Sequence, residues 1–227
     1  MSKLNFESPC LAWLIDPDKV NFSTLEESCK KANSLGFRLI LIGGSLIHSN
    51  IESLIVTLRK YTSLPIYLFP GSFFQLSNKA DGILFTSLLS GRNPEFLIGQ
   101  QIIAAPILKQ TSLDVVSTAY LLIENGRSTS VEYISNTKPI PADKLDIVLA
   151  TCYAAEYLGF SCIYLEAGSG ALKPVPVKLV KSVASSVKLP IIVGGGITNY
   201  HQVDAYFNAG AKMVVVGTAL EKGIFEK

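Results

Sequence analysis

Short apolar runs alternate with longer amphipathic segments along the whole chain. The runs are rich in Val, Ile and Leu and are bounded by Gly, Pro or charged residues, which is typical of β-strands. Because most of them are apolar at successive positions, they fit parallel strands that are covered on both faces. Eight strands are predicted, at residues 11–16, 38–43, 65–70, 82–87, 119–124, 162–167, 190–195 and 213–218.

Helical periodicity fills most of the intervals between these strands. In the segment 23–36, Ser23 is placed to cap a helix, Glu26 follows three residues later and Gly36 ends the pattern. Further helices are predicted at residues 49–63, 141–159, 176–187 and 199–209.

The alternation of strands and helices predicts an α/β protein. Eight such units predict a TIM (β/α)8 barrel, with residues 1–227 forming a single domain. A doubly wound open sheet is the alternative. The third unit is irregular, because only residues 72–80 lie between the segments "PIYLFPG" and "DGILFTS". We therefore expect the third helix to be absent or irregular, which would leave a gap in the outer ring of helices.

Composition narrows the classes of function. Hydrophobic residues make up 48% of the 227 residues and charged residues 17%, and the net charge is +2. These values favour a well-buried globular protein. Because Lys and Arg form no block, no nucleic acid is expected as a partner.

Neither a metal–thiolate site nor a membrane span is predicted. Cys10, Cys29, Cys152 and Cys162 form no CxxC pair, so we interpret them as buried, reduced thiols of a cytoplasmic protein. No apolar run reaches the ~20 residues of a transmembrane helix, and residues 1–10 lack the apolar core of a signal peptide. Any membrane contact would be peripheral, through a substrate or a surface patch. We also expect a homo-oligomer.

Glycine-rich loops follow the last three predicted strands. They contain Gly168 and Gly170, then Gly195 and Gly196, and finally Gly217. Glycine lets the backbone approach a ligand closely and direct several N–H groups at one point. The active site of a TIM barrel lies at the C-terminal ends of its strands, and the loops after strands seven and eight commonly bind phosphate. We predict a phosphate site here; tight turns without a ligand are the alternative.

Oxygen-bearing side chains end the first two strands. Asp16 closes the first and Ser45 follows the second. Mg²⁺ prefers oxygen ligands, keeps several waters and bridges to substrate phosphates, so this pair is a candidate magnesium site. The alternative is that Asp16 caps the next loop and Ser45 caps a helix.

A carboxylate beside the predicted phosphate loop needs an explanation. Glu166 ends the sixth strand, and Tyr164 points to the same face because it lies two residues earlier. A carboxylate repels phosphate, so its place is understandable if the phosphorylated ligand also carries hydroxyl groups. It could then accept hydrogen bonds from a hydroxyl and take its proton. Pairing of Glu166 with a nearby lysine is the alternative.

Aromatic residues gather around the irregular third unit. Core packing is the default interpretation of this set. The more specific interpretation is that these side chains line a binding site for an apolar ligand. The set comprises Tyr61, Tyr67, Phe69, Phe73 and Phe74.

Taken in order, the motifs "IDPDK", "GGS", "YLEAGSGA", "VGGGI" and "VVGTALE" resemble the geranylgeranylglyceryl phosphate synthase family over essentially the whole chain. Related heptaprenylglyceryl phosphate synthases carry a lysine two residues before the strand-one aspartate and have a shorter sixth loop. Leu14 and the long "EAGSG" loop of this chain are closer to the geranylgeranyl branch.

This resemblance implies a Mg²⁺-dependent prenyltransferase that joins geranylgeranyl diphosphate to the 3-hydroxyl of sn-glycerol 1-phosphate. Diphosphate would be released and the product would be an ether-lipid precursor. By the same resemblance, Asp16 and Ser45 would hold Mg²⁺, Glu166 would be catalytic, and the prenyl tail would run towards the missing third helix. The residues implied in binding glycerol 1-phosphate are Tyr164, Leu165, Glu166, Ala167, Gly168, Ser169, Gly170, Gly195, Gly196, Gly217 and Thr218.

Two other functions are compatible with the glycine-rich loops. One is a TIM-barrel isomerase or lyase acting on another small phosphorylated substrate, and the other is a non-catalytic barrel that binds a phosphorylated ligand. Neither requires a prenyl diphosphate site or an apolar groove.

Overall fold

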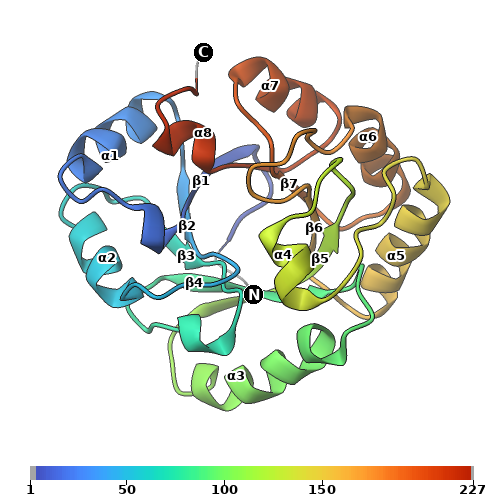
Figure 1. Ribbon diagram of the computed structural model, residues 1–227, viewed down its shortest axis with the longest axis horizontal. Helices are drawn as coiled ribbons and strands as arrows, with labels where there is room; N and C mark the ends of the chain where they lie inside the picture. The colour runs from blue at the N-terminus through green and yellow to red at the C-terminus, as the bar shows by residue number, and fades with distance from the viewer. Residues whose placement is uncertain (1–3, 226–227) are drawn as a thin grey trace.

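The computed structural model describes residues 4–225, which form a closed barrel of eight parallel strands in the order β1 to β8 (Figure 1). Cys10 to Trp13 of the first strand pair with Met213 to Val216 of the last, so the two ends of the chain close the barrel. The predicted TIM barrel is thereby confirmed. The strands are β1 Cys10–Ile15, β2 Leu39–Ile42, β3 Ile66–Leu68, β4 Gly82–Leu88, β5 Asp114–Leu122, β6 Cys162–Glu166, β7 Ile191–Gly194 and β8 Met213–Val216.

Helices form a ring around the strands, except for α4, which lies in front of β5 and β6 in Figure 1. Residues of α4 line the pocket described below. The helices are α1 Leu25–Ser34, α2 Ile51–Leu58, α3 Gln100–Leu108, α4 Ser130–Ser135, α5 Leu145–Tyr157, α6 Val177–Ser186, α7 Tyr200–Asn208 and α8 Thr218–Glu221.

The third unit has no α-helix between its strand and the next, as predicted from its length. A single 3-10 turn, Phe73–Gln75, replaces it. The buried Gln75 holds this segment in place, because its side chain donates to the Gly44 carbonyl at 2.9 Å and accepts from the Gly71 N–H at 2.9 Å.

Several local features differ from the sequence-based prediction; the short helices α4 and α8, for example, were not predicted. Ser23 is not the cap of α1: its N–H and hydroxyl both donate to Asn21, and the helix begins at Leu25. β5 begins five residues before the predicted strand, at Asp114, whose carboxylate accepts a 2.7 Å hydrogen bond from the Tyr67 hydroxyl. The helix α3 was not predicted, because it is apolar on its exposed as well as its buried face and so shows no clear helical period.

Alternating residues of the strands supply two apolar layers. On β6, Cys162 and Tyr164 belong to the layer inside the barrel, whereas Ile163 and Leu165 belong to the layer under the helices. Glu166, two residues beyond Tyr164, therefore points inside the barrel at its C-terminal mouth.

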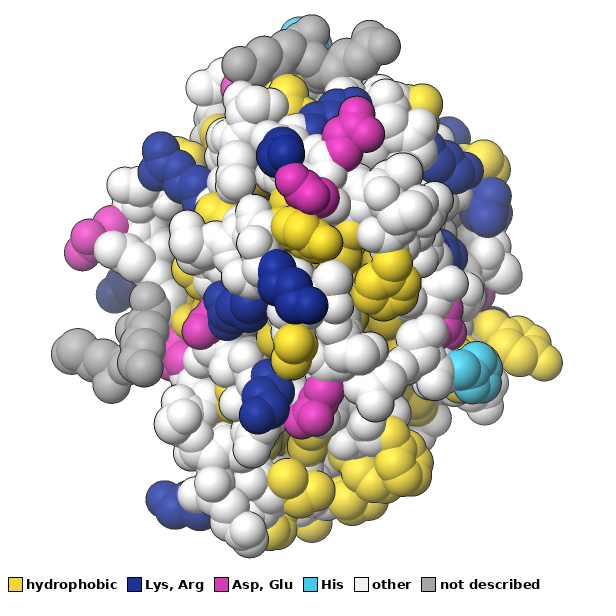
Figure 2. Space-filling view, turned by 90° about the vertical axis from the view of Figure 1, so that its left-hand side faces the viewer, with side chains coloured by type: hydrophobic (Ala, Val, Ile, Leu, Met, Phe, Trp, Pro, Cys, Tyr) yellow, Lys and Arg dark blue, Asp and Glu magenta, His cyan; other side chains and the backbone are white. Residues whose placement is uncertain are grey.

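The outer surface mixes side chains of both charges. On the side of α1 and α2, Lys and Arg lie among Asp and Glu, and apolar side chains gather towards the lower edge (Figure 2). Within residues 4–225, no helix combines the length and the apolar character needed to cross a bilayer.

Candidate active site

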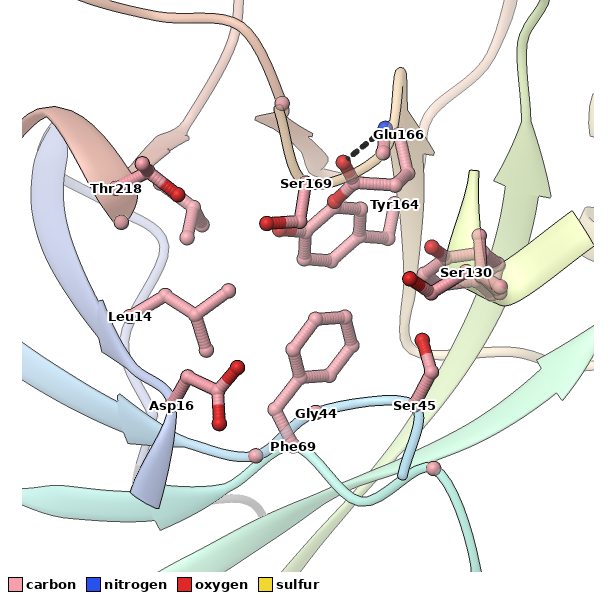
Figure 3. A pocket seen from close by; sticks show the side chains of 18 of the residues that line it. Leu14, Asp16, Gly44, Ser45, Phe69, Ser130, Tyr164, Glu166, Ser169 and Thr218 are labelled. Carbon is pink, nitrogen blue, oxygen red and sulfur yellow. Dashed lines mark hydrogen bonds between the residues drawn. The ribbon is translucent and has the colours of Figure 1, made fainter. Parts of the chain in front are cut away.

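A pocket of about 1110 Å³ opens at the C-terminal ends of the strands. Its polar chamber is formed by the loops after β1, β2, β6, β7 and β8, with further residues from the third and fifth units, and contains Asp16, Ser45 and Glu166 (Figure 3). An apolar groove continues from the chamber towards the missing third helix. The groove is lined by Phe73, Leu76, Phe85, Phe96 and Ala104.

Glu166 is the buried carboxylate of the polar chamber, with 5% of its surface exposed. The Gly168 N–H donates to its Oε1 atom. Burial raises the pKa of the Glu166 carboxyl to about 7, because the charged form loses hydration, while the Gly168 N–H and the adjacent Tyr164 hydroxyl lower it by a smaller amount. In residues 4–225 no lysine or arginine forms an ion pair with Glu166, so the lysine-paired interpretation is wrong. A carboxyl with a pKa near 7 can exchange a proton with a bound hydroxyl.

Tyr164 and two glycines enclose this carboxylate. A side-chain carbon on Gly194 would lie 2.3 Å from the Tyr164 hydroxyl, and one on Gly195 would overlap with Oε1 of Glu166. The Tyr164 hydroxyl is buried and has no hydrogen-bond partner of good geometry within the described chain. A buried hydroxyl without such a partner, beside a carboxylate that accepts from the Gly168 N–H and forms no ion pair, is a site where a polar ligand would supply further partners.

The glycine-rich loops converge on the same chamber. Gly168, Gly170, Gly195 and Gly196 all have positive φ, between 69° and 96°. Within residues 4–225, the N–H groups of Ser169, Gly170 and Gly196 donate to no other group. Free backbone N–H groups on loops that line one chamber suit an anion. The loop after β8 adds Gly217 and Thr218, which also line the pocket.

Asp16 and Ser45 both point into the chamber from neighbouring strand ends (Figure 3). The Asp16 carboxylate forms a 2.5 Å ion pair with Lys19 and accepts from the Asp18 N–H at 3.2 Å, so it does cap the following turn. Ser45 is not a helix cap, since Asn50 caps α2.

Two residues implied by the resemblance do not line the pocket. The side chains of Leu165 and Ala167 belong to the layer under the helices. The backbone of Ala167 is also engaged, because its N–H donates to the Gly194 carbonyl and its carbonyl accepts from Asn125. A ligand in the pocket therefore has no route to either side chain, because alternate residues of a strand face opposite sides.

Several pocket residues were missed from the sequence as components of the polar chamber, and Ser130 is one of them. Phe69 follows β3, Tyr120 lies on β5, and Arg127 follows β5. The Arg127 guanidinium lies 3.7 Å from where a side-chain carbon on Gly170 would be, beside the predicted phosphate loop. The turn "ENGR" at the end of the fifth strand was the available signal for Arg127.

Comparison with known proteins assigns the chain to a family. The model of the PcrB family matches residues 8–226. The chain belongs to the PcrB family. This assignment confirms the resemblance predicted from the motifs.

Relatives of this PcrB-family chain include two bacterial proteins named geranylgeranylglyceryl phosphate synthase. The one from Flavobacterium johnsoniae is 50% identical over 93% of this chain and 87% of its own length. The one from Chitinophaga pinensis is 45% identical over 93% of this chain and 84% of its own length.

A solved structure is similar in fold as well as in sequence. It is (S)-3-O-geranylgeranylglyceryl phosphate synthase from Thermoplasma acidophilum in complex with its substrate sn-glycerol-1-phosphate. The TM-score is 0.88 at 32% identity, over 95% of this chain and 87% of that one.

Proposed function

We propose that this PcrB-family protein is a geranylgeranylglyceryl phosphate synthase. It transfers the geranylgeranyl group of geranylgeranyl diphosphate to the 3-hydroxyl of sn-glycerol 1-phosphate, releases diphosphate and forms an ether-lipid precursor. The observation that carries this proposal is the continuity of the pocket. One space contains free backbone N–H groups, a buried carboxylate with a pKa near 7 and an apolar groove.

Each part of the pocket suits one part of the two substrates. The N–H groups of the loops after β6 and β7 suit the phosphate of glycerol phosphate. Glu166 is placed to orient the hydroxyl and to accept its proton as the ether bond forms. The apolar groove suits the prenyl tail, because each buried CH₂-sized group contributes about 0.8 kcal/mol of binding free energy.

Mg²⁺ is the cofactor included in this proposal, with Asp16 and Ser45 as its protein ligands. Within residues 4–225, no group of three or more His, Cys, Asp or Glu side chains could hold a metal ion. A pair of oxygen donors in an open chamber fits Mg²⁺, which takes much of its coordination from water and substrate phosphate. When bound, the ion would neutralise charge on the departing diphosphate.

Substitution of Asp16 tests this assignment. Asp16→Asn keeps the shape of the side chain but supplies a poorer ligand, so we expect turnover to fall by roughly 10²-fold or more while thermal unfolding is little changed. Raised Mg²⁺ should recover part of the rate. Lys188→Gln is the matched surface control and should leave turnover unchanged. Normal turnover of Asp16→Asn at ordinary Mg²⁺ would remove Asp16 from the metal site.

Product analysis tests the function itself. The purified protein is incubated with Mg²⁺, radiolabelled sn-glycerol 1-phosphate and a ladder of prenyl diphosphates from ten to thirty-five carbons. We expect the glycerol label to move into the organic phase and to stay on the lipid after phosphatase has removed the phosphate, because the ether bond survives, with one diphosphate released per product. Binding of glycerol phosphate without diphosphate release would favour the non-catalytic barrel. Conversion of the labelled substrate without any prenyl donor would favour an isomerase or lyase.

A further inference from the structure

Three aromatic rings stack inside the polar chamber. Phe69, Tyr120 and Tyr164 come from the third, fifth and sixth units of the barrel and all line the pocket. The Phe69 and Tyr164 ring centroids are 4.9 Å apart with planes 11° from parallel, and the Tyr120 and Tyr164 centroids are 5.5 Å apart. Tyr164 is fully buried and Phe69 is half-buried. Phe69 is therefore the ring of the stack that a ligand meets first.

Phe69 lies in the middle of the chamber. In Figure 3 its ring lies between Asp16 and Ser45, and Tyr164 and Glu166 lie above it. If the proposed function holds, the diphosphate is bound near Asp16 and Ser45 and the acceptor hydroxyl near Glu166. The carbon that is transferred from the diphosphate to the hydroxyl is then expected to pass near the Phe69 ring.

The reaction places positive charge on that carbon. The bond between C1 of the prenyl group and the diphosphate oxygen breaks, and its electron pair leaves with diphosphate. The resulting charge is shared by C1 and C3 of the allylic system. A lone pair of the glycerol 3-hydroxyl then forms the new C–O bond, and the hydroxyl proton passes to the Glu166 carboxylate.

We infer that Phe69 is a catalytic residue that stabilises the developing allylic cation through its ring face, with Tyr164 and Tyr120 holding the ring in place. The face of an aromatic ring attracts cations, most strongly where water is excluded. The nearby carboxylates have other tasks in the proposed reaction, because Asp16, which is paired with Lys19 in this structure, is assigned to Mg²⁺ and Glu166 to the hydroxyl proton. The inference rests on the proposed function, because only an ionising prenyl donor requires a cation to be stabilised here.

Packing alone could also account for a ring at this position, because layers of side chains fill the interior of a TIM barrel. A packing role and a cation-stabilising role predict different effects of the electron density of the ring on the rate. A packing role depends on shape and volume, whereas a cation contact weakens as fluorine atoms withdraw charge from the ring face.

The experiment replaces Phe69 with mono-, di- and trifluorophenylalanine in the full-length protein. Single-turnover rates are measured with Mg²⁺, sn-glycerol 1-phosphate and geranylgeranyl diphosphate at saturation. We expect the logarithm of the rate to fall steadily along the series, by roughly threefold to thirtyfold in total, with the dissociation constants of both substrates nearly constant. Phe37 is the matched control: it is buried against Phe225 in the layer under the helices and does not line the pocket. Fluorination of Phe37 should leave the rate unchanged.

A second variant, Phe69→Leu, keeps an apolar side chain but removes the ring. Its single-turnover rate should fall by about tenfold or more while glycerol phosphate still binds normally. A flat rate along the Phe69 fluorine series, in a wild-type protein that turns over, would overturn the inference and leave the proposed function intact. A wild-type protein that releases no diphosphate would overturn both.

Discussion

At the scale of single residues, burial of the Glu166 carboxylate lowers the free energy of unfolding of the protein. Burial raises its pKa to about 7 in the folded protein, and the unfolded chain has the usual value near 4.3. Between these two values the folded state binds the proton more tightly than the unfolded state, so the free energy of unfolding falls as the pH rises from about 4 to about 7. Above pH 7 the full destabilisation is present.

Glu166→Gln should therefore stabilise the protein at pH 8. The amide keeps the size of the side chain and removes the buried charge, so we expect the free energy of unfolding to rise by about 1–3 kcal/mol at pH 8 and to approach the wild-type value at pH 4. Urea unfolding at both pH values measures this. Glu27→Gln, at an exposed position of α1, is the control and should change stability by less than about 0.5 kcal/mol. A destabilised Glu166→Gln protein at pH 8 would mean that the carboxylate is held by contacts worth more than its burial costs.

The same substitution should have the opposite effect on catalysis. If the Glu166 carboxylate accepts the hydroxyl proton, kcat/KM of the wild-type protein should rise with pH and level off above about 7. In Glu166→Gln the rise of kcat/KM with pH should disappear, and the rate should fall by roughly 10²–10⁴-fold while glycerol phosphate still binds. Steady-state kinetics from pH 5.5 to 9 and isothermal titration calorimetry provide the two measurements. A near-normal rate in this variant would exclude the proton-accepting role.

At the scale of elements, the loop after β7 is shaped around the carboxylate of β6. A side-chain carbon on Gly195 would overlap with Glu166 Oε1 and lie 2.7 Å from the Gly168 N–H. Gly36, after α1, has a similar positive φ, 78° against 86°, but nothing lies within 4 Å of its side-chain position. The two glycines therefore share a backbone conformation and differ in their surroundings.

Alanine at these two positions separates backbone strain from damage to the site. Gly36→Ala should cost about 1 kcal/mol of stability through the positive φ, and Gly195→Ala should cost more, because its side chain would also overlap with the Gly168 backbone. Only Gly195→Ala should also displace the Glu166 carboxylate, with an expected loss of roughly 10²-fold or more in turnover. Thermal unfolding and turnover are measured for both proteins. Equal turnover of the two variants would show that the loop tolerates a side chain beside Glu166.

The elements also show what the sequence could predict. The strands were found because Val, Ile and Leu run through both faces of a parallel barrel, and the missing third helix followed from the few residues available. Residues at strand ends, such as Asp16 and Glu166, were found because the fold sends all strand ends to one mouth. By contrast, Phe69 and Tyr120 become parts of the chamber only through contacts between distant strands. No local pattern encodes such contacts. The capping of α1 was misjudged for a different, local reason, because the N–H and the hydroxyl of Ser23 both donate to Asn21, two residues earlier.

At the scale of the whole molecule, closure of the barrel joins the two ends of the chain in one site. The Asp16 N–H, after β1, donates to the Glu221 carboxylate of α8 at 3.3 Å, although 205 positions separate them in the sequence. The polar chamber thus depends on loops from the first, second, sixth, seventh and eighth units being in register. A ligand of this chamber binds only the folded barrel and should stabilise it as a whole. The expected homo-oligomer stays a prediction, because the structure describes one chain.

Thermal unfolding with glycerol phosphates tests recognition at this scale. At a concentration of 100 times its dissociation constant, sn-glycerol 1-phosphate should add about 2.7 kcal/mol to the free energy of unfolding. For a chain of 227 residues this corresponds to a rise of about 5–10 °C in Tm.

The enantiomer of this ligand, sn-glycerol 3-phosphate, tests whether the hydroxyl is recognised. It offers the same phosphate to the loop N–H groups but directs its hydroxyls differently past Glu166, so it should raise Tm much less at the same concentration. In Glu166→Gln the two shifts should become similar, because the carboxylate that accepts the hydroxyl hydrogen bonds has gone. Inorganic phosphate measures the contribution of the loops alone. Equal shifts for both enantiomers in the wild-type protein would mean that the chamber recognises phosphate without recognising the hydroxyl that the proposed reaction requires.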